Sequence, residues 1–194
     1  MRIGILALQG AFIEHAQMLD RLGADHFEIR CRDDLDRPMD GLIIPGGEST
    51  VMAKLLRELG MHDRLKEMID GGLPVFGTCA GMIVLAQTLG DGTPGALATL
   101  PMKVQRNAYG RQLASFNCVA PFADVGDVPM EFIRAPYVMD PGDCDVLAKD
   151  TEGHVVAVRK DNQIATAFHP ELTDCTAVHR YFLEMAAAAK SPNN

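Results

Sequence analysis

A cysteine flanked by glycines lies where a short apolar run meets a strongly apolar segment. The sequence Gly-Thr-Cys-Ala-Gly at residues 77–81 has the pattern of a nucleophile elbow, in which the reactive residue occupies a sharp turn between a strand and a helix. That turn places the Cys79 sulfur at a helix N-terminus, where free N–H groups and the helix dipole favour the thiolate over the thiol. A buried core cysteine between two packing glycines is the alternative interpretation, because free cysteines are commonly buried.

A histidine and a glutamate two residues apart follow another apolar run, in Phe168-His169-Pro170-Glu171. In an extended chain, residues i and i+2 point to the same side, and Pro170 biases His169 away from helix. The Glu171 carboxylate can therefore hold the His169 imidazole, which gives a base with its orienting acid but without a nucleophile. Taken alone, the segment is more typical of a solvated strand end.

Two adjacent glycines, Gly46 and Gly47, lie in the segment Pro-Gly-Gly-Glu-Ser-Thr at residues 45–50, again between a predicted strand and helix. Their backbone can approach a ligand closely and aim N–H groups at a developing negative charge. A phosphate loop is excluded because the Walker spacing and lysine are missing. The alternative is a plain turn with Ser49 or Thr50 as the helix N-cap.

The three segments together supply a nucleophile, a base, an orienting carboxylate and oxyanion donors. All three follow predicted strands, and open α/β sheets place their sites at the carboxyl ends of strands. Each segment is ambiguous alone, but their combination completes one mechanism of acyl transfer. The chemistry depends on whether the fold brings them together.

The first half of the chain alternates short apolar strands with amphipathic helices. We predict strands over residues 2–8, 26–30, 41–44 and 74–77, and helices over residues 12–22, 61–70 and 80–89. A further helix after residue 47 has one predicted apolar face, made of Val51, Met52, Leu55, Leu56 and Leu59. The helix at 80–89 is apolar on almost every side, which predicts a central position. This rhythm predicts a parallel sheet with helices on both faces.

A predicted loop at residues 90–100 separates the two halves of the chain. The pattern of the second half predicts short strands interrupted by Pro and Gly. We predict strands around residues 112–120, 131–133, 145–148, 154–159 and 164–168, which form an antiparallel or mixed extension of the sheet. A closing helix should turn Val178, Tyr181, Phe182, Met185 and Ala189 inward. The expected fold is a three-layer, open, mostly parallel α/β sheet. We expect residues 1–190 to form a single domain and residues 191–194 a flexible tail.

Bulk composition narrows the functional classes. The 194 residues are 47% hydrophobic and 23% charged, as in an ordinary globular protein, and the net charge of −8 leaves no basic stripe for nucleic acid. No apolar run approaches the roughly 20 residues needed to span a bilayer. The five cysteines are widely spaced without a C-x-x-C pair, which suits a reducing cytosol better than disulfides or a metal site. We therefore expect a cytoplasmic protein without bound metal.

A wider set of segments carries a resemblance to a known family. They are Leu-Gln-Gly at 8–10 with Glu-His at 14–15, the segments at 45–50 and 77–81, Arg-Asn-Ala-Tyr-Gly-Arg-Gln at 106–112, Phe-Ile-Arg-Ala-Pro at 132–136 and Ala-Phe-His-Pro-Glu at 167–171. By these segments the chain resembles the class I glutamine amidotransferases, in the family's order over residues 8–171. The segments at 45–50, 106–112 and 132–136 resemble the family's vitamin B6 branch in particular.

The resemblance implies that the protein hydrolyses L-glutamine to L-glutamate and ammonia. Cys79 would attack the side-chain carboxamide to form a γ-glutamyl thioester, and His169, positioned by Glu171, would transfer the protons. The backbone N–H groups of Gly47 and Ala80 would form the oxyanion hole. The implied glutamine-binding positions are Gly47, Glu48, Ser49, Arg106, Arg134 and Ala135. From the residues alone, Arg106 or Arg134 would more simply be a surface ion pair.

The resemblance also implies a partner. Ammonia released into neutral water becomes ammonium and loses nucleophilicity, so the chain should dock on a synthase that receives it directly. In the vitamin B6 branch this partner is the (β/α)8-barrel subunit of pyridoxal 5′-phosphate synthase, and pyridoxal phosphate is the product of the complex and no cofactor of this chain. Three alternatives stay open: a glutaminase subunit for another pathway, a hydrolase or redox chaperone on a similar sheet, and a non-catalytic scaffold.

Overall fold

The computed structural model describes residues 1–109 and 115–190 of the chain. The first part of its sheet is parallel because each short apolar strand is followed by a connection that returns to the same edge. Strand β1 lies between β2 and β3, and β3 pairs with β4. These strands are β1 (Arg2–Leu6), β2 (Asp25–Ile29), β3 (Gly41–Ile44) and β4 (Val75–Thr78).

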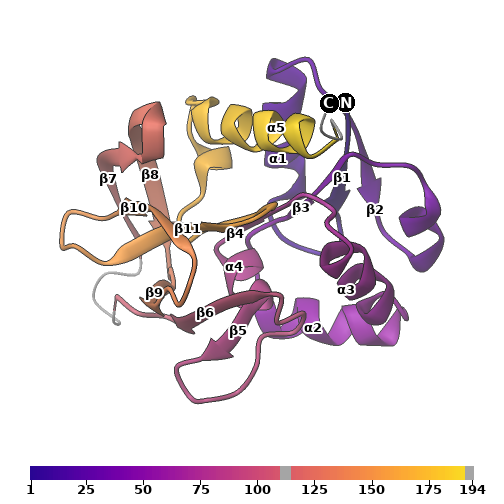
Figure 1. The fold of residues 1–194 in the computed structure, drawn as a ribbon, viewed down its shortest axis with the longest axis horizontal. Helices are drawn as coiled ribbons and strands as arrows, with labels where there is room; N and C mark the ends of the chain where they lie inside the picture. Colours follow the sequence, from indigo (N-terminus) through magenta and orange to yellow (C-terminus); the bar gives the residue numbers. More distant parts are fainter. Residues whose placement is uncertain (110–114, 191–194) are drawn as a thin grey trace.

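The helices cover both faces of the parallel part of the sheet. Helices α1 and α5 lie on one face, and α2, α3 and α4 lie on the other (Figure 1). Their bounds are α1 (Phe12–Arg21), α2 (Ser49–Glu58), α3 (His62–Asp70), α4 (Ala80–Leu85) and α5 (Ala177–Lys190). Short 3-10 turns complete these connections at η1 (Arg32–Asp36), η2 (Ala123–Val125) and η3 (Pro170–Leu172). Within the described residues, no helix is long and apolar enough to cross a membrane.

The sheet continues into a mostly antiparallel part through one late strand. Strand β12 (Gln163–Thr166) pairs in parallel with β4, and its other edge pairs with β11 (Val155–Lys160) in the antiparallel sense. The order then runs through β10 (Asp145–Lys149), β7 (Ser115–Phe122) and β8 (Gly126–Ile133). The open α/β sheet with helices on both faces and a mixed extension confirms the predicted fold class. Its core includes fully buried Ile5, Ile43 and Phe76 on the central strands.

The apolar segment at residues 80–89 is not one helix. Helix α4 ends at Leu85, and residues 86–89 form strand β5, which pairs with β6 (Leu100–Gln105). The prediction was wrong because backbone N–H groups from the following loop donate to the last carbonyls of α4: Leu97 to Val84 (2.8 Å) and Thr99 to Leu85 (2.9 Å). Strand β6 and its antiparallel neighbour β9 (Tyr137–Asp140) were also not predicted.

In helices α2 and α5, fewer residues are buried than the sequence predicted. In α2 only Met52 and Leu56 of the predicted apolar face are buried, whereas Val51 and Leu59 are 43% and 40% exposed. A helix that packs along one narrow stripe cannot bury residues on its flanks. Ala189 is likewise exposed, because residues 187–190 of α5 extend beyond the core. Parts of the strand predicted at 112–120 and of the segment at 106–112, together with the tail predicted at 191–194, lie outside the described residues.

Candidate active site

The cysteine elbow forms where β4 ends and α4 begins. Cys79 has a φ of 48°, an unfavourable value for a residue with a β-carbon, and its N–H donates to the Thr166 carbonyl of β12 at 2.7 Å. The flanking glycines are required by space: a β-carbon at Gly77 would lie 2.8 Å from the Gly81 carbonyl carbon, and one at Gly81 would lie 2.2 Å from the Ile44 oxygen. The surrounding structure thus holds Cys79 in a strained turn.

The histidine arm, made of His169 and Glu171, follows β12, the strand beside β4. His169 Nδ1 donates to Glu171 Oε1 at 2.7 Å, and both side chains are buried. The His169 backbone N–H donates to the Glu131 carbonyl on β8, which fixes the point at which the chain turns into η3. Because β4 and β12 are adjacent and parallel, their carboxyl ends bring Cys79 and His169 together although 90 residues separate them in the chain.

His169 carries a positive charge at neutral pH. Burial opposes that charge, but the neighbouring Cys79 and the hydrogen bond to Glu171 outweigh it and raise the pKa of His169 to about 10. An imidazolium beside a sulfur stabilises negative charge there, so the arrangement suits a nucleophilic thiolate. Glu171 acts from the far side of the ring and fixes which nitrogen faces Cys79.

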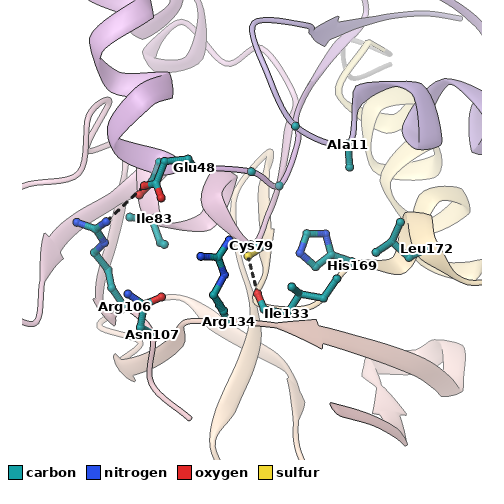
Figure 2. Close-up of a pocket in the computed structure, with 14 residues that line it drawn as sticks. Ala11, Glu48, Cys79, Ile83, Arg106, Asn107, Ile133, Arg134, His169 and Leu172 are labelled. Atoms are coloured by element: carbon teal, nitrogen blue, oxygen red, sulfur yellow. Dashed lines mark hydrogen bonds and ion pairs between the residues drawn. The ribbon is translucent and has the colours of Figure 1, made fainter. Parts of the chain in front are cut away.

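A cavity of about 290 Å³ opens above these residues. Figure 2 shows the Cys79 sulfur and the His169 ring facing each other at its wall, with Arg134 beside the sulfur and Glu48 and Arg106 on the opposite side. A space of this size suits a small ligand such as an amino acid. Cys79 Sγ also lies 3.9 Å from the Ile133 carbonyl oxygen.

The far wall pairs an acidic residue with a basic one, Glu48 with Arg106. Arg106 Nη2 lies 3.7 Å from Glu48 Oε1. The pKa of Glu48 is lowered chiefly because the backbone N–H and hydroxyl of Thr50 donate to its carboxylate, with smaller contributions from Arg106 and Arg134. Glu48 is also the N-cap of α2, whereas the alternative interpretation of this segment gave that position to Ser49 or Thr50. A fixed carboxylate and two guanidinium groups can together meet the zwitterionic end of an amino acid.

The remaining predicted positions separate into two groups. Gly47 and Ser49 line the cavity, whereas Ala80 and Ala135 are buried outside its described wall. Ala135 is 1% exposed, and its carbonyl accepts the N–H of Ala108 at 3.0 Å, so its described contact supports the neighbouring loop.

Several residues of the cavity wall had no assigned role in the sequence. Gly10 and Asn107 lay in the family segments, and both have positive φ values, of 91° and 47°. A β-carbon on Gly10 would collide with the Gly46 oxygen, so this glycine lets two loops meet at the cavity. The other wall residues carry no polar signal that could have revealed them; they are Ala11, Ile83, Ile133 and Leu172.

The loop that carries Gly47 and Glu48 is held by a side-chain amide. Gln9 Oε1 accepts the Glu48 N–H at 3.1 Å, and Gln9 Nε2 donates to the Glu48 carbonyl at 3.2 Å. The same amide leaves no room for a side chain at residue 47, because a β-carbon on Gly47 would lie 2.5 Å from Gln9 Nε2. Gln9 therefore fixes the backbone on which the predicted oxyanion donor lies.

A cysteine elbow beside a histidine–glutamate arm, on an open sheet of this order, is the arrangement of a class I glutamine amidotransferase. Residues 5–188 match the SNO glutamine amidotransferase family, and the chain belongs to that family. Pyridoxal 5′-phosphate synthase subunit PdxT of Methanocorpusculum labreanum is 55% identical over 187 residues, which cover 96% of this chain and 98% of that protein. The protein of the same name from Desulfitobacterium hafniense is 51% identical, covering 98% and 96%.

A solved structure agrees with these relatives. A crystal structure described as a glutamine amidotransferase superposes with a TM-score of 0.90 at 42% sequence identity and covers 95% of this chain and 98% of that one. A more distant crystal structure, of a glutamine amidotransferase from Thermotoga maritima, is 14% identical and covers 99% of this chain and 86% of that one. Its TM-score of 0.64 shows a shared fold alone. The family resemblance seen in the sequence is thereby confirmed.

Proposed function

We propose that this protein is the glutaminase subunit of a pyridoxal 5′-phosphate synthase, and that it hydrolyses L-glutamine and delivers the ammonia to a synthase subunit. The observation that carries the proposal is that Cys79 and His169 meet at one cavity, with Glu171 bonded to the His169 ring from behind and with Glu48 and Arg106 on the far wall. The relatives of about 50% identity named as subunits of that synthase support the choice of pathway. We take residues 1–190 as one domain, because one continuous sheet carries both arms of the site.

The chemistry proceeds through a thioester. Cys79 Sγ attacks the side-chain carbonyl carbon of glutamine, and the resulting oxyanion is stabilised by backbone N–H groups, for which Gly47 and Ala80 are the candidates. His169, charged at rest, gives its proton to the departing nitrogen, which leaves as ammonia. The neutral imidazole then takes a proton from water as the water attacks the thioester. Glutamate and the starting form of Cys79 result.

Three charged residues of the cavity wall orient the substrate. The guanidinium groups of Arg106 and Arg134 suit the α-carboxylate of glutamine, and the Glu48 carboxylate suits its α-ammonium group. Such contacts at the remote end of the substrate hold the carboxamide over Cys79. Analogues of glutamine that lack either the carboxamide or the zwitterion should therefore be poor substrates.

The partner is proposed to dock at the cavity mouth. Ile133 and Leu172 line the cavity and are 41% and 42% exposed, so both present apolar surface to a partner at this point. A (β/α)8-barrel synthase subunit that covers them would receive ammonia before it meets water, and its docking would complete the oxyanion hole. The five cysteines are free, in keeping with the proposed cytoplasmic location.

Glutamate release by the purified protein, with and without the barrel subunit of a pyridoxal 5′-phosphate synthase, tests the proposal. We expect hydrolysis of glutamine to be strongly stimulated by that subunit. The matched comparison uses an imidazole-phosphate synthase subunit, which should give no stimulation. Stimulation by the imidazole-phosphate synthase subunit alone would show that the protein serves a different pathway. Hydrolysis of peptides without turnover of glutamine would show that the protein is a different kind of hydrolase.

A further inference from the structure

A cluster of polar side chains lies buried directly behind the candidate triad. His15 of α1, Thr78 of β4, Glu171 of η3 and His179 of α5 meet there, and each is at most 5% exposed. His15 Nδ1 lies 2.9 Å from His179 Nε2, and His15 Nε2 lies 3.1 Å from Thr78 Oγ1 and 3.6 Å from Glu171 Oε1. Four separate elements are thus joined through the His15 ring.

Both buried histidines are neutral. Burial, and then the nearby His179 and His169, lower the pKa of His15 well below its usual value, and burial lowers the pKa of His179 to about 3. The geometry agrees, since a charged His15 would lie beside the His169 imidazolium, which already pairs with Glu171. Each of the two rings therefore has one N–H donor and one acceptor nitrogen.

The hydrogen-bond pattern selects one tautomer for each ring. His179 Nδ1 has no partner among the described residues, so a proton on it would leave a buried donor unsatisfied. Its proton therefore lies on Nε2, which donates to His15 Nδ1. His15 must then carry its own proton on Nε2, the nitrogen that faces Thr78 Oγ1 and Glu171 Oε1. The reverse arrangement would also aim a lone pair of His15 at the Glu171 carboxylate.

We propose that His15, protonated on Nε2, is a positioning residue that ties the cysteine elbow to the carboxylate orienting His169. Thr78 immediately precedes Cys79, and Glu171 holds the His169 ring, so one imidazole supports both arms of the site. The inference rests on the proposed glutaminase function and assigns it a residue beyond the triad.

The Glu171 carboxylate depends on this support. Its Oε2 atom is buried and has no hydrogen-bond partner among the described residues, so Oε1 carries the polar contacts of the group. One contact is the His169 N–H, and the other is the longer approach of His15 Nε2. Without the His15 N–H, the Glu171 carboxylate would have a single polar neighbour to set its orientation. If the carboxylate shifted, the His169 ring bonded to it would shift as well.

The first test is the tautomeric state of the rings. Nitrogen-15 imidazole spectra of the full-length protein, assigned with His15→Gln and His179→Gln, should show both histidines neutral with the proton on Nε2 from about pH 6 to pH 8, near and above the unperturbed histidine pKa. A spectrum with His15 charged, or with its proton on Nδ1, would overturn the proposal. This readout depends on the direction of the hydrogen bonds and is insensitive to packing alone.

The second test is steady-state glutaminase activity in the complex with the barrel subunit. In His15→Leu the ring volume is largely kept but the N–H is lost, and we expect kcat to fall about 10- to 100-fold with KM changed little. In His15→Gln, the side-chain amide places an N–H near the same point and should restore most of kcat. His26→Gln, a histidine on the remote edge strand β2, is the matched control and should match the wild type.

The outcomes separate this inference from the proposed function. If the wild-type complex releases no glutamate, the proposed function itself fails. If the wild type is active and His15→Leu keeps its kcat, only the role of His15 is refuted. Should His15→Leu fail to fold, His15→Gln and the tautomer spectra decide: a kcat of His15→Gln reduced as far as that of Cys79→Ala would contradict a role that one N–H can fill.

Discussion

Gly46 lies so close to the His169 ring that a β-carbon there would stand 2.2 Å from His169 Cε1 and 2.8 Å from Nδ1. Gly46→Ala must therefore displace the imidazole from its position beside Cys79 or shift the loop that carries residue 46. We expect glutaminase activity in the complex to fall about 10²-fold or more, as a displacement of about 1 Å can cause. Thermal unfolding provides the control, since a folded but inactive variant is the expected result. Activity near that of the wild type would show that the ring has another productive position.

Removal of the nucleophile should abolish glutamine hydrolysis without affecting binding to the barrel subunit. Cys79→Ala is expected to abolish glutamine hydrolysis while binding to the barrel subunit is preserved, because only the sulfur is lost. His169→Asn should be nearly as inactive, since losses within one catalytic unit are not additive. Glutamate release and co-elution with the barrel subunit measure the two properties. Near-normal turnover in either variant would refute the assigned roles, and Cys144→Ala, which alters a different buried cysteine, is the matched control.

The raised pKa of His169 predicts a pH dependence of stability. Its folded-state value of about 10 exceeds the roughly 6.5 of an unfolded histidine, so the stabilisation is complete below about pH 6.5 and is lost as the pH rises through about 10. We expect the free energy of unfolding to decline over this range, and to decline less in Cys79→Ala, which removes one cause of the shift. Denaturant unfolding across that range measures the difference. Equal declines in both proteins would contradict a contribution of Cys79 to the raised pKa of His169.

The arginine at the far wall should influence binding more than chemistry. Arg106→Lys keeps the charge but loses the planar fork that can meet both oxygens of an α-carboxylate, so we expect KM for glutamine to rise about 10-fold with little change in kcat. Arg180→Lys, exposed on α5, is the control. A selective fall in kcat would mean that Arg106 acts on the reacting carboxamide and not on the α-carboxylate.

A buried aspartate supports the loop that carries Arg106 and Asn107. Asp150 accepts the Tyr109 hydroxyl at 2.7 Å, the His154 ring at 3.0 Å and the backbone N–H groups of Glu152 and His154. The first contact fixes Tyr109, near the end of the described part of that loop. Asp150→Ala leaves these donors unpaired and should lower the free energy of unfolding by about 2–3 kcal/mol, as for buried hydrogen bonds to a charged group. Chemical denaturation measures this change, and a loss below about 0.5 kcal/mol would show that solvent replaces the carboxylate.

Local chemistry made part of this structure predictable. The apolar strands of the first half and the glycines at Gly77 and Gly81 predicted the parallel sheet and the elbow, because both depend on residues close in sequence. The end of α4 could not be predicted, since it is set by N–H groups from Leu97 and Thr99 that only the folded loop supplies. The cavity positions of the apolar residues Ile133 and Leu172 could not be predicted either, because an apolar side chain does not indicate by its type that it lines a polar site.

The contact between His15 and His179 could not have been predicted from the sequence. The two rings lie 164 residues apart in the chain and 2.9 Å apart in the structure. Both occur in helices whose periodicity predicts only that one face is inward, and nothing in that pattern indicates a polar pair. Their tautomers follow from neighbours that belong to four different elements.

The position of β12 beside β4 has a consequence during synthesis of the chain. Strand β12, which aligns with the cysteine elbow, is made late in synthesis, so a nascent or truncated chain that ends before residue 169 possesses the sulfur but neither its base nor its orienting acid. A chain that has not been extended through residue 171 therefore lacks the full set of residues proposed to hydrolyse glutamine.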